Sequence, residues 1–203
     1  MPNAPGTTIA AIAFDTKLED YDGLRSIIQV IALVEADKVV AANRSIIEED
    51  AVIAFGGYRI DTARYILSRD VRAFGVLFHS HARGARCPEG GDGESMTSGG
   101  TYLTLWIRES EHLRAIFNTS LYHWTSLDGH VCRDDVRIIG ARITTIGVER
   151  TSSNGFADLS ITVRVTQEDY SLGEITDKRT VRKVLKYDGQ SYGIEMFNFF
   201  WDQ

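Results

Sequence analysis

Short apolar runs, separated by glycine-rich or charged breaks, make up the first two thirds of the chain. Their length and their β-branched and aromatic content predict strands at 7–14, 30–34, 38–42, 51–55, 58–60, 71–78 and 101–107. Apolar residues also recur at helical spacing in the segment 18–28, and the segment 62–68 is helix-like. Together these segments predict a mixed α/β order.

Beyond about Gly140 the pattern changes to regular alternation of apolar and polar residues. Strands are expected at Arg142–Val148 and Leu159–Val165, and the Asn154-Gly155 pair between them is a strong hairpin signal.

A second hairpin is expected in the same region. It runs from Val181 to Tyr187, turns at Asp188-Gly189 and returns through Tyr192 toward the aromatic end Met196–Trp201. Residues 141–203 are therefore predicted to form a β extension. Its aromatic end is expected to close a core, with docking of a partner as the alternative.

Candidate chemistry is concentrated at the end of the predicted strand 71–78. His79 and His81 follow it directly, and because a strand alternates faces with period two, both should lie on one face with Ser80 on the other. The loop 82–92 contains Pro88 and several glycines and can bring Asp92 back to the histidines. Two imidazoles and a carboxylate, with a fourth position left for water, are a typical catalytic zinc site.

The spacing around these residues resembles the signature of the JAMM/MPN (JAB1/MPN/Mov34) metalloprotease family, written HSHx7SxxD. His79-Ser80-His81, seven residues ending in Pro88, and Asp92 match it position for position, whereas Glu89 stands where the family has serine. Asn43 and the Tyr58–Asp61 segment are similar to the family's upstream motif.

Downstream, 101–107 and 122–132 look like the next core strand and the closing hairpin of that family. The resemblance implies an α/β MPN domain over residues 1–140, a mixed sheet flanked by helices, followed by the β extension at 141–203. It also implies zinc as the cofactor, held by His79, His81 and Asp92.

Two positions depart from the family pattern. Glu89 would place a carboxylate where a neutral donor stabilises the oxyanion. The general base of the family corresponds to Gln29, whose amide accepts no proton. Glu35, just past the strand 30–34, and Glu89 itself are the alternative candidates for the base.

Composition narrows the function classes. The chain has 203 residues, a net charge of −6 and a pI near 5.4, which disfavours binding to nucleic acid or to a membrane surface. The amino-terminal residues carry no charged leader pattern, and the apolar runs are too short to span a bilayer, so a cytoplasmic or virion location is expected. Cys87 and Cys132 form no CxxC pair, so neither a disulfide framework nor a thiolate zinc site is expected.

Two functional classes remain open at this point. The resemblance implies a zinc-dependent peptidase or isopeptidase that acts on a protein or peptide, including one with a ubiquitin-like tail. The alternative is an inactive MPN-fold scaffold in a larger assembly, such as a phage tail or virion component, with the β extension as its contact.

Overall fold

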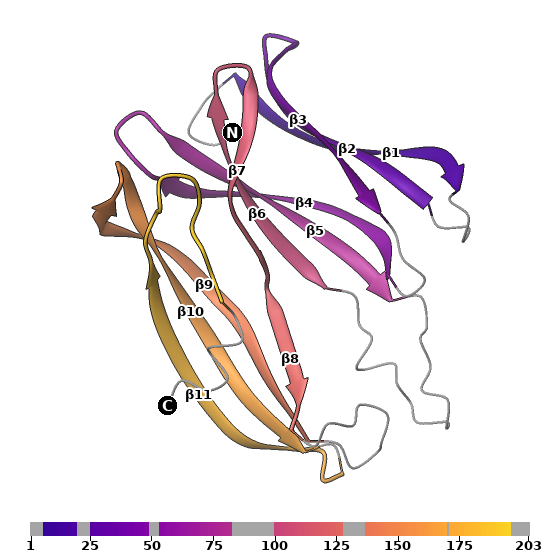
Figure 1. The fold of residues 1–203 in the computed structure, drawn as a ribbon, viewed down its shortest axis with the longest axis vertical. Coiled ribbons are helices and arrows are strands. Elements are labelled where there is room, and N and C mark those ends of the chain that lie inside the picture. Colours follow the sequence, from indigo (N-terminus) through magenta and orange to yellow (C-terminus); the bar gives the residue numbers. More distant parts are fainter. Residues whose placement is uncertain are drawn as a thin grey trace. The chain divides into compact units, whose positions relative to one another are not determined.

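The computed structural model describes residues 6–19, 25–48, 53–82, 100–127, 137–169 and 171–195, and every regular element in these ranges is a strand (Figure 1). The strands are β1 Thr7–Glu19, β2 Arg25–Glu35, β3 Lys38–Glu48, β4 Ile53–Ile66, β5 Arg72–Ala82, β6 Thr101–Glu109, β7 His112–Ser120, β8 Tyr122–Ser126, β9 Arg137–Ser153, β10 Phe156–Asp169 and β11 Glu174–Leu185.

The prediction of an α/β MPN domain flanked by helices is wrong. The described residues form an all-β structure, and the segments expected to be helical lie in strands or next to them. None of the described ranges holds a helix that could cross a membrane.

The two helix predictions failed for different reasons. The segment 18–28 ends β1 and begins β2, and its β-branched residues Ile27 and Ile28 pair with β3. The segment 62–68 belongs mostly to β4, where the register with β5 shifts between Asp61 and Tyr65. The residues expected to be helical are therefore the extra residues of a bulged strand.

The described residues are organised in two compact units. The first contains β1 to β5, β6 from Tyr102 and β7 up to Asn118, and its strands form one sheet in the order β1-β2-β3-β7-β6-β5-β4. β3 meets β7 in parallel at Ala42 and His112, and the Ala42 N–H donates to the Glu111 carbonyl at 3.1 Å. The edge strands β1 and β4 approach each other, so this sheet is curled and nearly closed.

The core of the first unit lies on the concave face of the curled sheet. Side chains from five strands meet there: Ile31, Leu33, Ala41, Phe74, Val76, Trp106 and Leu113. Full burial of one large apolar side chain contributes about 1.5–3 kcal/mol, so this cluster is a main source of the unit's stability.

The second unit is built on an antiparallel sheet in the order β11-β10-β9-β8. The hairpin predicted at Asn154-Gly155 is present between β9 and β10, with both residues at positive φ. Of the second predicted hairpin, the turn is present: the Asp188 N–H donates to the Ser191 carbonyl, and an isolated bridge joins Tyr187 to Tyr192. Residues 181–185 belong to β11, which pairs with β10. The aromatic end 196–201 lies outside the described residues.

Candidate functional site

The first unit contains a cavity of about 240 Å³ on the inner face of its curled sheet. Strands β2 to β7 all contribute to its walls. The lining side chains fall into aromatic residues (Tyr58, Phe78, Tyr102, Trp106), aliphatic residues (Ile31, Ile47, Val76) and polar residues (Gln29, Thr104, Asn118). An apolar cavity of about 150 Å³ is enough to hold benzene, so this cavity has room for a substituted aromatic ring.

The aromatic side of the cavity is a continuous series of rings from β4, β5 and β6. Tyr58 and Phe78 have ring centroids 6.2 Å apart, and Phe78 and Tyr102 lie 6.1 Å apart. Phe55 extends the series, with its ring centroid 5.2 Å from Tyr58 and 5.5 Å from Phe78. All four pairs are tilted, a geometry in which ring edges and faces are available to a further ring.

The polar side of the cavity is organised by Gln29. Its Oε1 accepts a hydrogen bond of 2.9 Å from the Tyr58 hydroxyl, and its Nε2 donates to Ser45 Oγ at 2.6 Å. Burial raises the pKa of Tyr58 to about 12, so its hydroxyl stays protonated and remains a donor at neutral pH. The Gln29 amide is therefore held in one orientation by partners from β3 and β4.

Trp106 combines a ring that lines the cavity with a buried polar atom. Its side chain lines the cavity and is only 7% exposed, and its Nε1 is buried with no hydrogen-bond partner in the part of the chain that the structure describes. Leaving such a donor unpaired costs about 1–3 kcal/mol. The nitrogen is enclosed by protein atoms, so it does not belong to the polar lining of the cavity.

The two histidines predicted to bind zinc lie in β5, which continues four residues past the predicted strand end at Phe78. His79 pairs with Gly57 of β4 and His81 with Ala54. Ser80, between them, is 4% exposed. Asp92 and Glu89 lie outside the described residues, as do Cys87 and Cys132. Among the described residues no cluster of three histidine, cysteine or carboxylate side chains is placed to hold a metal.

The candidate bases Gln29 and Glu35 lie on the inner face of the curled sheet. On β5, Val76 and Phe78 line the same cavity as Gln29, so the next residue, His79, points to the opposite face. Glu35 is six residues beyond Gln29 on β2 and shares its face, about 20 Å away at the usual rise of a strand. The sheet therefore separates both candidates from His79.

Glu35 has structural partners of its own. Its Oε1 accepts a hydrogen bond of 3.0 Å from Thr7 Oγ1 and lies 3.6 Å from Arg108 Nη1. These contacts tie β1 and β6 to the end of β2.

Sequence reasoning did not find the cavity, although its pattern is present in the chain. Phe74, Val76 and Phe78 alternate along β5, and Tyr102, Thr104 and Trp106 alternate along β6. Alternation identifies the inner face of each strand but not which strands share it. No protein-family model, curated protein or solved structure matches the chain. The resemblance to the JAMM/MPN family consequently stays a prediction.

Proposed function

We propose that the first unit binds a small, largely aromatic molecule in the cavity of its curled sheet. The observation that carries the proposal is the series of rings from Tyr58, Phe78 and Tyr102 along one side of a cavity of about 240 Å³. A ligand ring placed against them gains burial and about 0.5–1.5 kcal/mol for each well-arranged ring pair.

Polar groups limit which aromatic molecules fit best. Gln29, Thr104 and Asn118 line the cavity and offer hydrogen-bonding groups to a ligand. Ligand sites are commonly apolar with a few polar groups that fix the orientation of the ligand. We therefore expect a ring that carries one hydrogen-bond acceptor, such as a carbonyl, to bind better than a plain hydrocarbon.

Calorimetric titration with acetophenone tests this proposal. At about 0.5 kcal/mol per non-hydrogen atom, a probe of this size should bind with a dissociation constant on the order of 1 mM. Cyclohexyl methyl ketone, which has a saturated ring of the same size, should bind several times more weakly, because it cannot make ring pairs.

Two neighbouring residues provide matched variants. Ile47 lines the cavity, whereas Ile46 is 61% exposed and alternates to the other face of β3. Ile47→Phe should fill the cavity and weaken acetophenone binding about tenfold or more, and Ile46→Phe should leave it unchanged. Absence of binding to the wild type, or equal binding by both variants, would contradict the proposal.

Zinc-dependent hydrolysis of an amide bond is a second proposal, and one observation favours it. β5 carries His79 and His81 two residues apart, where its register with β4 shifts between Phe55 and Gly57. Zinc would be held by these histidines and Asp92 and would activate water, as the family resemblance implies. The acceptor of the water's proton would then have to be Glu89 or another group on the side of the sheet where His79 lies. The role of an inactive scaffold in a larger assembly stays a prediction.

A further inference from the structure

A second cavity, of about 230 Å³, lies at the β4–β5 hairpin. This hairpin is the purple loop at the left of Figure 1. Three arginines, Arg64, Arg69 and Arg72, line the cavity together with one carboxylate, Asp70. Three positive charges and one negative charge leave a local excess of +2 in a chain whose net charge is −6.

The guanidinium group of Arg72 is fixed by the backbone around it. Its Nη2 donates to the carbonyl of Thr62 at 3.0 Å and lies 3.5 Å from the carbonyl of Ala63. Both carbonyls belong to the irregular part of β4, between Asp61 and Tyr65. In a regular β-sheet such carbonyls accept hydrogen bonds from the neighbouring strand. At the bulge they are available to Arg72 instead, and they hold its side chain at the cavity.

The remaining nitrogens of Arg72 have no such partners. Its Nε and Nη1 are buried and form no hydrogen bond within the described ranges. None of the three arginines forms an ion pair with a carboxylate among the described residues. A guanidinium removed from water without a counter-charge is unfavourable, and the closeness of three of them adds repulsion.

The turn itself is well ordered by local hydrogen bonds. Ser68 Oγ accepts from the Val71 N–H at 3.1 Å and from the Asp70 N–H at 3.3 Å, and the Leu67 N–H donates to the Val71 carbonyl at 2.9 Å. Arg69 and Asp70 are thus held on a defined turn between Arg64 and Arg72. The arginine side chains are therefore carried by an ordered hairpin.

We propose that this arginine cavity binds the phosphate group of a small phosphorylated molecule. Guanidinium groups match phosphate oxygens in fork-like pairs, and a phosphate near neutral pH carries about −1.5 to −2 charges. That charge balances the local excess of +2, whereas a carboxylate would balance only half of it. The site is independent of the aromatic cavity: Tyr58 and Ile66 pair with Phe78 and Arg72, which lie six residues apart on β5, about 20 Å at the usual strand rise.

Calorimetric titration of the full chain at constant ionic strength tests this site. The probes are inorganic phosphate, glycerol 3-phosphate and acetate, with chloride adjusted so that screening is the same in each titration. Phosphate and glycerol 3-phosphate should bind at least about tenfold more tightly than acetate. Tighter binding of the ester would identify a phosphate ester as the ligand, and equal binding would identify free phosphate.

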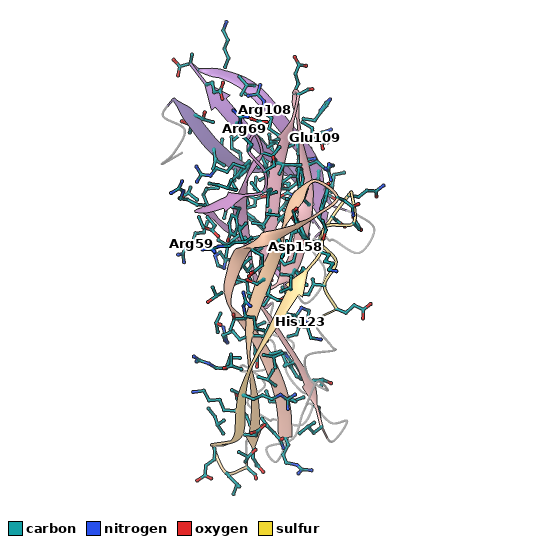
Figure 2. All side chains as sticks on the ribbon, turned by 90° about the vertical axis from the view of Figure 1, so that its left-hand side faces the viewer. Arg59, Arg69, Arg108, Glu109, His123 and Asp158 are labelled. Atoms are coloured by element: carbon teal, nitrogen blue, oxygen red, sulfur yellow. The ribbon has the colours of Figure 1, made fainter. Side chains whose placement is uncertain are left out.

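Charge-removing variants locate the binding. Arg64→Gln and Arg69→Gln alter exposed side chains, so folding should be unaffected. Each should weaken phosphate binding about fivefold or more, because each removes one charge-assisted contact. Arg59→Gln is the matched control, since Arg59 is exposed on the same strand but outside the cavity; Figure 2 labels it apart from Arg69.

Arg72→Lys keeps the charge but loses the guanidinium fork, and it should weaken binding without changing the sign of the local charge. Circular dichroism and cooperative thermal unfolding confirm that each variant is folded. Equal effects of Arg59→Gln and Arg69→Gln, acetate binding as tight as phosphate binding, or no phosphate binding at constant ionic strength would overturn the proposal.

Discussion

The Tyr58 hydroxyl donates a hydrogen bond of 2.9 Å to Gln29 Oε1, and this bond joins β4 to β2 across the inside of the curled sheet. The two strands are not neighbours in the sheet order, since β3, β7, β6 and β5 lie between them along one direction. A hydrogen bond between strands that are not neighbours restrains the curvature of the sheet. It also fixes the polar side of the aromatic cavity.

Replacing Tyr58 by phenylalanine should therefore destabilise the protein. The change removes the hydroxyl donor, so Gln29 Oε1 loses this hydrogen bond on the inside of the curled sheet. The expected loss in the free energy of unfolding is about 1–2 kcal/mol. Tyr102→Phe is the matched control, because Tyr102 lines the same cavity but its hydroxyl does not take part in the bond to Gln29. Urea unfolding measures both. Equal losses in the two variants would show that the Tyr58–Gln29 bond has no special role.

Gly75 on β5 is required for a close approach between strands. A Cβ at this position would meet Asp61 Cβ and Leu103 Cδ1, each at 2.9 Å. Gly75→Ala should lower the free energy of unfolding by about 1–3 kcal/mol through overpacking. Gly193→Ala, where nothing lies within 4 Å, should be neutral or slightly stabilising. A Gly75→Ala protein as stable as the wild type in urea would contradict the packing described between β4, β5 and β6.

His123 should make the stability depend on pH just below neutrality. Burial lowers the pKa of His123 from its ordinary value of 6.5, so the folded state keeps this imidazole neutral while the unfolded chain takes up a proton. The stability should be full above about pH 7 and should fall as the pH drops through 6.5 toward the lowered pKa.

His123→Gln removes the titrating group and tests that dependence. Denaturant unfolding of wild type and variant between about pH 5 and 9 should give parallel free energies above about pH 7.5 and a weaker decline in the variant below that pH. An identical decline in both proteins would assign the pH dependence to other groups.

Zinc binding by His79, His81 and Asp92 is tested by metal analysis after dialysis against zinc. The wild type should retain about one zinc per chain, and His79→Ala and His81→Ala should lose it, because three protein ligands are the usual minimum for such a site. His112→Ala, on β7, is the control. Unchanged zinc content in both ligand variants would rule out this site.

Gln29 should not become a catalytic base by mutation. It lies on the opposite face of the sheet from His79, so Gln29→Glu should create no chelator-sensitive cleavage of a Gly-Gly-linked amide. The new carboxylate should instead destabilise the fold, because it would lie among the aromatic side chains of the cavity. Chelator-sensitive activity that is gained in Gln29→Glu, or that is lost in Glu35→Gln, would contradict the placement of these residues.

Strand positions could be predicted from the sequence, whereas the way the strands curl could not. The runs at 30–34, 38–42 and 71–78 lie within or largely within β2, β3 and β5, because dense β-branched and aromatic residues identify strands locally. The apolar spacing from Leu18 to Ile28 was misleading, since it combined the end of one strand with the start of the next. Local periodicity carries no signal for such a boundary.

For a related reason, only part of the candidate site could be predicted from the sequence. Alternation correctly places His79 and His81 in one strand with a buried Ser80 between them. The meeting of Gln29 with Tyr58, however, depends on a sheet order in which β7 follows β3. Such long-range pairing is set by the packing of the whole unit.

The most direct test of the aromatic cavity is the location of bound acetophenone by nuclear Overhauser effects to methyl groups. Ile47 lines the cavity with Ile31, whereas Ile46 and Ile12 are exposed, 61% and 46%. We expect effects from the ring protons of acetophenone to the methyl groups of Ile31, Ile47 and Val76, and none to those of Ile46 or Ile12. Effects confined to Ile12 and Ile46 would place the ligand on the exposed face and contradict the proposed function.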